Sequence, residues 1–226
     1  MTKVSCIIPA YNEGPRIETV LRVVYNHPLI DEVIVVDDAS KDNTKDIVGK
    51  FENVRLIIHE KNQGKSQAVV DGVMASKREF IFFLDADLIG LTPQDISDLI
   101  EPVVFRRADI AISLRKNSPW VSRKIGLDFI SGERVFPKAL IQNNLDEIKR
   151  LARFGLEVYL NKLIIKNKYR IKIVFWKNVI SPWPYNKSGL IKGVKSFIFM
   201  IRDILRTVSI FEIIRQFIRM SFLKVE

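Results

Sequence analysis

The chain has 226 residues, 47% of them hydrophobic, and a formal net charge of +10, so it can bury one substantial core and favours anionic partners such as nucleic acid, a nucleotide-linked substrate or an acidic membrane surface. Its single cysteine, Cys6, excludes a disulfide framework and a zinc site of cysteines and histidines, and it indicates a reducing, cytosol-facing compartment. Neither a signal peptide nor a charge-free apolar segment of the roughly 18 residues that span a membrane is recognisable, so we expect a cytoplasmic protein without a membrane span.

Strands and helices alternate along most of the chain. Apolar runs bounded by turn residues predict six strands, over 3–8, 32–36, 54–58, 80–84, 109–114 and 170–176. Apolar residues at helical spacing predict five helices, over 15–26, 44–51, 66–76, 93–105 and 153–166. This alternation is typical of an α/β fold in which a mostly parallel sheet carries helices on both faces.

Polar clusters follow three of the predicted strands, at 11–13, at 37–40, and at Asp85 and Asp87. Because the carboxyl ends of parallel strands share one edge of a sheet, we expect the three clusters to converge on one ligand. Asp85 and Asp87 are separated only by Ala86, and two such carboxylates can share a divalent cation that also takes oxygens from a diphosphate. Solvated turns are the alternative, since aspartate is common where strands end.

Four motifs in this order resemble the N-terminal half of family 2 glycosyltransferases with the Rossmann-like GT-A fold: PAYNEG, VIVVDDASKDNT, NQGKSQA and FLDAD, within residues 3–115. The resemblance implies an inverting enzyme that takes a sugar from a UDP- or GDP-sugar and uses Mg²⁺ or Mn²⁺ held by Asp85 and Asp87. It also implies the residues that bind the donor nucleotide, namely Pro9, Tyr11, Glu13, Asp38, Lys65, Asp85 and Arg115. The chemistry agrees, because a tyrosine can stack on a base and carboxylates can accept hydrogen bonds from a base or ribose.

A further segment, Ser131-Gly132-Glu133-Arg134, resembles one that dolichol- and polyprenyl-phosphate sugar transferases carry before a helix. The resemblance implies that Ser131, Gly132 and Arg134 bind a lipid phosphate acceptor through a hydroxyl, an amide and a guanidinium. A glycine turn with a surface arginine is the alternative.

The predicted catalytic residues are Asp87, Arg134 and Glu157. Family members with hydroxyl acceptors usually show a Glu-Asp pair at the start of the corresponding helix, whereas here Val158 follows Glu157, which favours an acceptor that needs no base. Transfer to a sugar or protein hydroxyl, with Glu157 as base, is the alternative within the class. A basic nucleic-acid-binding protein is the alternative from another class. It is disfavoured because acidic strand ends would repel phosphate unless a metal intervenes, so we expect no nucleic acid partner.

The composition changes after Tyr185. Apolar stripes flanked by lysine and arginine run over 190–208 and 210–220, as in helices that lie on an anionic membrane. We therefore expect a catalytic domain over 1–185 and a basic amphipathic tail over 186–226 that holds the protein on the cytosolic face of a membrane. Packing of these helices on the catalytic domain, or a homo-oligomer formed through them, is the alternative. The segment 117–127 shows no clear period and is predicted to be a mobile loop over the site.

Overall fold

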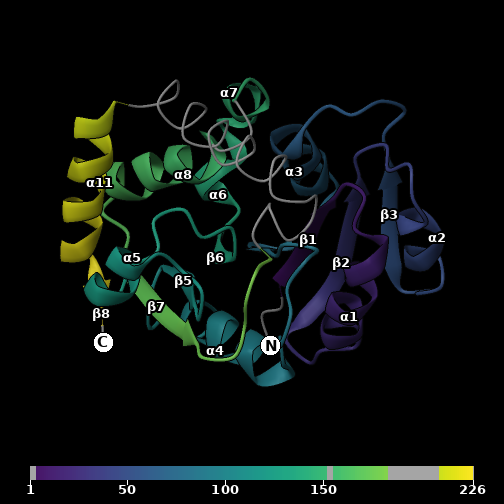
Figure 1. Cartoon of the computed structure of the whole chain (residues 1–226). Helices are drawn as coiled ribbons and strands as arrows, with labels where there is room; N and C mark the ends of the chain where they lie inside the picture. The colour runs from purple at the N-terminus through teal and green to yellow at the C-terminus, as the bar shows by residue number, and fades with distance from the viewer. Residues whose placement is uncertain (1–3, 152–154, 183–208, 226) are drawn as a thin grey trace.

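The structure, a computed structural model, describes residues 4–151, 155–182 and 209–225. Its centre is an eight-stranded sheet in the order β3-β2-β1-β4-β6-β5-β7-β8 (Figure 1). The strands are β1 (Val4–Ala10), β2 (Ile30–Asp37), β3 (Val54–Ile58), β4 (Phe80–Phe83), β5 (Ile110–Arg115), β6 (Arg134–Pro137), β7 (Ile171–Trp176) and β8 (Lys224–Val225). In this sheet β6 runs antiparallel to β4 and β5, and the other pairs are parallel. The predicted, mostly parallel α/β fold is confirmed, and each of the six predicted strands ends within two residues of its predicted bounds.

Helices cover both faces of the sheet. They are α1 (Gly14–Val24), α2 (Thr44–Val48), α3 (Lys65–Ala75), α4 (Pro93–Val104), α5 (Trp120–Ile125), α6 (Ala139–Gln142), α7 (Leu145–Lys149), α8 (Gly155–Lys166) and α11 (Ile210–Phe222). One hydrophobic core joins the sheet to α1, α2 and α4, and a second joins it to α3, α6, α7, α8 and α11. The two layers of helices cover the faces of the sheet, and the carboxyl ends of the central parallel strands lie along one edge of it.

The central strands read as continuous apolar runs because both of their faces are buried. In β4, Phe80 and Phe82 enter the first core, whereas Ile81 and Phe83 enter the second. On the second face α3 approaches closely, since a Cβ at Gly72 would lie only 2.5 Å from Ile7 Cγ2. The close packing of this helix on the sheet therefore depends on a glycine.

The segment 117–127, predicted to be a loop, contains the short helix α5. Gly126 ends this helix in the left-handed conformation, with φ of 68°. The apolar side chains of Trp120, Val121 and Ile125 are exposed instead of packed on the core. Because this helix buries only the polar Ser122 and has no buried apolar face, its sequence shows no apolar period that would predict a helix.

The described part of the predicted tail packs on the sheet domain. Strand β8 pairs with β7, and Met220 of α11 is buried in the second core beside α8. The rings of Phe129 and Phe217 also meet edge to face, with centroids 5.7 Å apart. The predicted boundary at residue 185 therefore does not separate α11 and β8 from the catalytic domain. The predicted stripe over 190–208 lies outside the described residues.

Among the described helices, none combines the length and the apolar character required to cross a membrane.

Candidate active site

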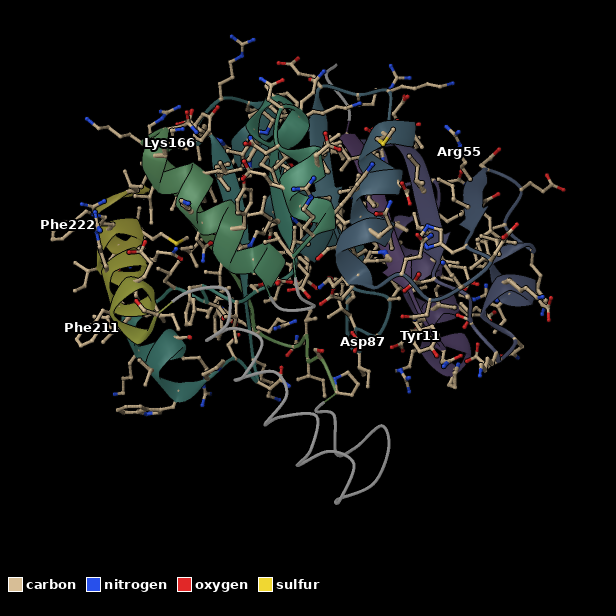
Figure 2. The ribbon with its side chains drawn as sticks, turned by 90° about the horizontal axis from the view of Figure 1, so that it is seen from above. Tyr11, Arg55, Asp87, Lys166, Phe211 and Phe222 are labelled. Atoms are coloured by element: carbon tan, nitrogen blue, oxygen red, sulfur yellow. The ribbon has the colours of Figure 1, made fainter. Side chains whose placement is uncertain are left out.

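A pocket of about 310 Å³ lies at the carboxyl ends of β1, β2 and β4. Six of the seven predicted donor-binding residues line it, together with Asp87, and Arg115 is the exception. The full lining is Pro9, Ala10, Tyr11, Glu13, Asp38, Asn62, Gly64, Lys65, Ala68, Asp85, Ala86 and Asp87. Figure 2 shows Tyr11 and Asp87 on the same side of the molecule. The expected convergence of the three polar clusters is therefore present.

Side-chain hydrogen bonds tie the loop after β1 to the loop after β2. The backbone N–H of Asn12 donates to Ser40 Oγ, and the backbone N–H of Glu13 donates to Thr44 Oγ1, each at 2.9 Å. Asn12 holds a left-handed conformation, with φ of 56°, and its side-chain oxygen accepts from the backbone of Lys41. These contacts fix the first turn after the strand and leave the Tyr11 ring partly exposed at the pocket.

Asp38 organises the opposite wall of the pocket. Its carboxylate accepts hydrogen bonds of 2.8 Å from the backbone N–H groups of Gln63 and Gly64, and it also pairs with His59 Nδ1. The other ring nitrogen of His59 lies 3.0 Å from Asp71 Oδ2. Asp38 thus holds the turn before α3 against the pocket, and its carboxylate is largely engaged by the protein itself.

Lys65, the first residue of α3, links two predicted site carboxylates. Its Nζ lies 2.9 Å from Asp85 Oδ1 and 3.0 Å from Glu157 Oε1. Desolvation lowers the pKa of Lys65, but the charges of Asp85 and Glu157 outweigh it and raise the pKa above its ordinary value. Lys65 is therefore a fixed cation between the two acids, and Glu157 belongs to the same site although it comes from α8.

A second cation, Arg115 at the end of β5, lies on the other side of Asp85. Its Nη1 is 3.9 Å from Asp85 Oδ2 and 2.8 Å from Oε1 of the buried Glu133. Glu133 also accepts hydrogen bonds of 2.8 Å from the hydroxyls of Ser113 and Ser131. Burial lowers the pKa of Arg115, yet Glu133 and the other nearby acids raise it above its ordinary value. Arg115 therefore stays charged beside Asp85.

The predicted acceptor residues Ser131 and Arg134 are directed into the protein. Arg134 is fully buried in β6 and donates to the carbonyls of Ser131 and Phe129 and, at 2.6 Å, to Asn161 Oδ1. Burial lowers its pKa to about 10. In this arrangement neither side chain reaches the pocket, so a direct contact of Ser131 or Arg134 with an acceptor phosphate does not fit the structure. The reason is that β6 inserts between β4 and β5, which turns this segment into the core.

Gly132, the third predicted acceptor residue, does lie at the site. A Cβ at this position would be 2.9 Å from Asp85 Oδ2 and 3.1 Å from Lys65 Nζ. The backbone therefore passes directly against the Asp85–Lys65 ion pair, and a side chain at residue 132 would require Asp85 or Lys65 to move.

Residues 5–165 match the family described as glycosyl transferase family 2. The chain belongs to this family. A UDP-N-acetylglucosamine–dolichyl-phosphate N-acetylglucosaminyltransferase of Methanococcus voltae is 30% identical over 208 residues, which cover 74% of this chain and 81% of that protein. A dolichyl-phosphate beta-glucosyltransferase of Trichomonas vaginalis is 40% identical over 108 residues, which cover 42% of this chain and only 32% of that protein.

Solved structures show the same fold as this family 2 glycosyltransferase. Glucosyl-3-phosphoglycerate synthase from Mycobacterium tuberculosis, in complex with Mn²⁺, uridine diphosphate and phosphoglyceric acid, superposes with a TM-score of 0.71 at 20% identity, over 96% of this chain and 78% of that one. The family and the GT-A fold predicted from the four motifs are therefore confirmed.

The pocket of this family 2 glycosyltransferase contains oxygen ligands of the kind that bind a hard divalent cation. Asp85 and Asp87 line one wall, and carboxylate oxygens are preferred ligands of Mg²⁺ and Mn²⁺. Within residues 4–151, 155–182 and 209–225, no three or more histidine, cysteine or acidic side chains are grouped so that they could hold a metal ion by themselves. The two carboxylates therefore fit a cation that takes its other ligands from a bound diphosphate and water.

Several residues of this site are not among those predicted from the sequence. Ser181 follows β7 and places its Oγ 3.4 Å from both carboxylate oxygens of Asp87. His59 pairs with Asp38, and Asn62 lines the pocket beside it. Glu133 accepts a hydrogen bond from Arg115. The quoted motifs already contained Asn62 and Glu133. The contacts of Glu133 with Arg115 and of Ser181 with Asp87, however, join separate segments of the chain and leave no local signal.

Proposed function

We propose that this family 2 glycosyltransferase moves a sugar from a UDP- or GDP-sugar to the phosphate of a polyprenyl or dolichyl lipid, with inversion at the anomeric carbon. The observation that carries the proposal is the Lys65 ammonium between Asp85 and Glu157. It pairs with the carboxylate that a hydroxyl acceptor would need as its base, and it adds positive charge where a phosphate would approach. The names of the two relatives above, both dolichyl-phosphate sugar transferases, support the lipid phosphate.

The pocket suits the donor nucleotide. Tyr11 offers a partly exposed ring for stacking on the base, and Glu13 and Asn62 offer acceptors and donors for the base or ribose. Asp85 and Asp87 would hold Mg²⁺ or Mn²⁺, which would neutralise the negative charge that develops on the leaving nucleotide diphosphate.

The acceptor phosphate is ionised near neutral pH and needs no base. One of its oxygens attacks the anomeric carbon while the bond from that carbon to the diphosphate oxygen breaks, and the electron pair leaves with the nucleotide. Lys65 and Arg115 supply two fixed cations beside Asp85 to balance the anionic groups that meet there. Arg134 and Ser131 then act as positioning residues, because their buried contacts hold the Gly132 backbone against Asp85.

The test is transfer by the purified chain with Mn²⁺, using UDP-N-acetylglucosamine, UDP-glucose and GDP-mannose as donors. Polyprenyl phosphate and a panel of alkyl glycosides serve as alternative acceptors. We expect a glycosyl phosphate lipid of inverted anomeric configuration, identified by NMR, and no product with the glycosides. Transfer to a glycoside with polyprenyl phosphate inert would overturn the proposal.

Transfer to a hydroxyl acceptor is the second candidate, because Glu157 lies at the site, 3.0 Å from the lysine that also contacts Asp85. Glu157→Gln separates the two reactions. With a hydroxyl acceptor, loss of a general base lowers the rate by about a hundredfold to ten-thousandfold. With a phosphate acceptor, the variant loses only the charge that orients Lys65, and we expect a decrease of about tenfold or less.

A further inference from the structure

Helix α11 carries apolar side chains on two opposite faces. Phe217 and Met220 pack inward on the second core, and Gln216 is buried beside them. The outward face presents Phe211, Ile214, Ile218 and Phe222, and the two phenylalanines are 80% and 85% exposed. Figure 2 shows Phe211 and Phe222 on the outer side of the helix, at the edge of the molecule. Packing on the catalytic domain therefore accounts for one face of α11 and leaves the other open to a partner.

Helix α5 lies next to this outward surface. Figure 1 shows α5 beside the C-terminal end of α11 and strand β8, and Lys224 Nζ donates to the carbonyl of Ile125 at 2.9 Å. Trp120, Val121 and Ile125 of α5 are exposed, Trp120 by 66%. We call the exposed apolar side chains of α5 and α11 the apolar ridge.

Cations border the ridge on the side of α8. A groove of about 510 Å³ between α8 and α11 is lined by Lys162, Lys166, Arg215 and Arg219 against the single acid Glu212. Gln216 also lines it, and its buried side-chain oxygen has no hydrogen-bond partner among the described residues. Arg123 and Lys124 add two exposed cations on α5. Positive charge next to an exposed apolar stripe suits phospholipid phosphates next to acyl chains.

We propose that the apolar ridge rests on an anionic phospholipid bilayer, with lipid phosphates in the α8–α11 groove. The occupant is a membrane because the surface combines Trp and Phe side chains with a basic border. If a second copy of the chain bound here through the same surface, its cations would face the cations of the first copy and repel them. Helix α5 belongs to the connection between Arg115 and Gly132, both of which contact or border Asp85. Docking α5 would therefore bring the connection that borders Asp85 close to the lipid surface.

Vesicle flotation tests this inference without donor or acceptor, so its outcome does not depend on the proposed reaction. Phosphatidylcholine vesicles with and without phosphatidylglycerol are compared for the wild-type chain and for two double variants. Phe211→Ser with Phe222→Ser removes apolar contacts, and Arg215→Gln with Arg219→Gln removes charge. The matched control is Ile58→Ser with Met74→Ser, two exposed apolar residues away from the ridge. Ile58 lies in β3, the opposite edge strand of the sheet, and Met74 lies in α3.

We expect the wild type to float with the anionic vesicles and much less with neutral ones. The phenylalanine variant should bind about tenfold more weakly because two rings no longer enter the interface. The arginine variant should lose most of the preference for anionic vesicles, and the control should behave as wild type. Unfolding temperatures confirm that the variants fold. Wild-type levels of vesicle binding by the phenylalanine variant would overturn the proposal. It would also be overturned if the wild-type chain does not bind vesicles and instead forms a dimer that the phenylalanine substitutions dissociate.

Discussion

The ammonium nitrogen of Lys65 lies 2.9 Å from Asp85 Oδ1, inside the pocket that we assign to the donor. A divalent cation that approaches Asp85 alone meets a positive charge already in place, and the two repel. A bound diphosphate changes the balance, because its oxygens attract both the lysine and the cation. Metal and nucleotide are therefore expected to bind together far better than metal alone.

Lys65→Met should separate these effects. We expect Mn²⁺ to bind the variant more tightly than the wild type in the absence of nucleotide, and UDP to bind about tenfold more weakly in its presence, since a charge-assisted contact to phosphate is lost. Electron paramagnetic resonance measures free Mn²⁺, and calorimetry measures UDP. Lys61→Met, at an exposed position in the loop before α3, is the control. Equal Mn²⁺ affinity in wild type and variant would contradict the expected repulsion.

Asp85→Asn and Asp87→Asn should each abolish Mn²⁺-dependent binding of UDP and leave the fold intact. Both side chains follow β4 and do not belong to its packed run, so little core packing is lost. Calorimetry with Mn²⁺ and with EDTA measures the dependence, and Asp46→Asn on the surface of α2 is the control. If both variants bind UDP as the wild type does, the metal site is assigned to the wrong residues.

Gly132→Ala should weaken donor binding more than it weakens the fold. The new Cβ would lie within 3.0 Å of both Asp85 carboxylate oxygens, so Asp85 has to move away from its position in the pocket. We expect a decrease in UDP affinity of at least about tenfold, measured with Mn²⁺ present. Gly49→Ala is the control, because the nearest atom to a Cβ there is 3.4 Å away. An unchanged UDP affinity of Gly132→Ala would show that the backbone at residue 132 moves and Asp85 keeps its position.

Arg134→Met should act mainly on stability. Removing the buried guanidinium leaves Asn161 Oδ1 and the carbonyl of Ser131 without their donor, whereas the carbonyl of Phe129 keeps the hydrogen bond from Asn161 Nδ2. Loss of such a buried partner costs on the order of 3 kcal/mol in the free energy of unfolding. Urea unfolding gives this value, and Arg107→Met at an exposed position is the control. A variant of normal stability with a specific loss of binding to the phosphate acceptor would restore the direct role predicted from the sequence.

Asp109 predicts a pH dependence at the edge between β5 and β7. Side-chain hydrogen bonds from Arg170, at 3.0 and 3.1 Å, lower the pKa of Asp109 below its ordinary value. A lowered pKa in the folded state contributes stability above the unfolded-state pKa near 3.9, and this contribution disappears as the pH falls through the folded-state pKa. Asp109→Asn should therefore be less stable than wild type at pH 7, and the two should converge in acid. A gap that persists below the folded-state pKa would exclude this linkage.

The sequence by itself determined the family, the order of the central strands and helices along the chain, and most of the residues that line the pocket that we assign to the donor. It could do so because the pocket is built from short local motifs at strand ends, and the parallel arrangement places those ends on one edge. Tyr11, Asp38 and Asp85 needed no further information to be brought together, since each follows a strand that its own apolar run predicts.

Only the tertiary structure decided where the segment around Arg134 and helix α11 lie. Four residues that enter a sheet antiparallel, between strands distant in sequence, have no period that distinguishes them from a surface turn. Likewise, the sequence of a helix with apolar residues on two faces indicates that both faces have partners, but it does not indicate which face packs on the core. Both were settled by long-range packing: Arg134 by the carbonyls and the asparagine around it, and α11 by α8 and the strand that follows it into the sheet.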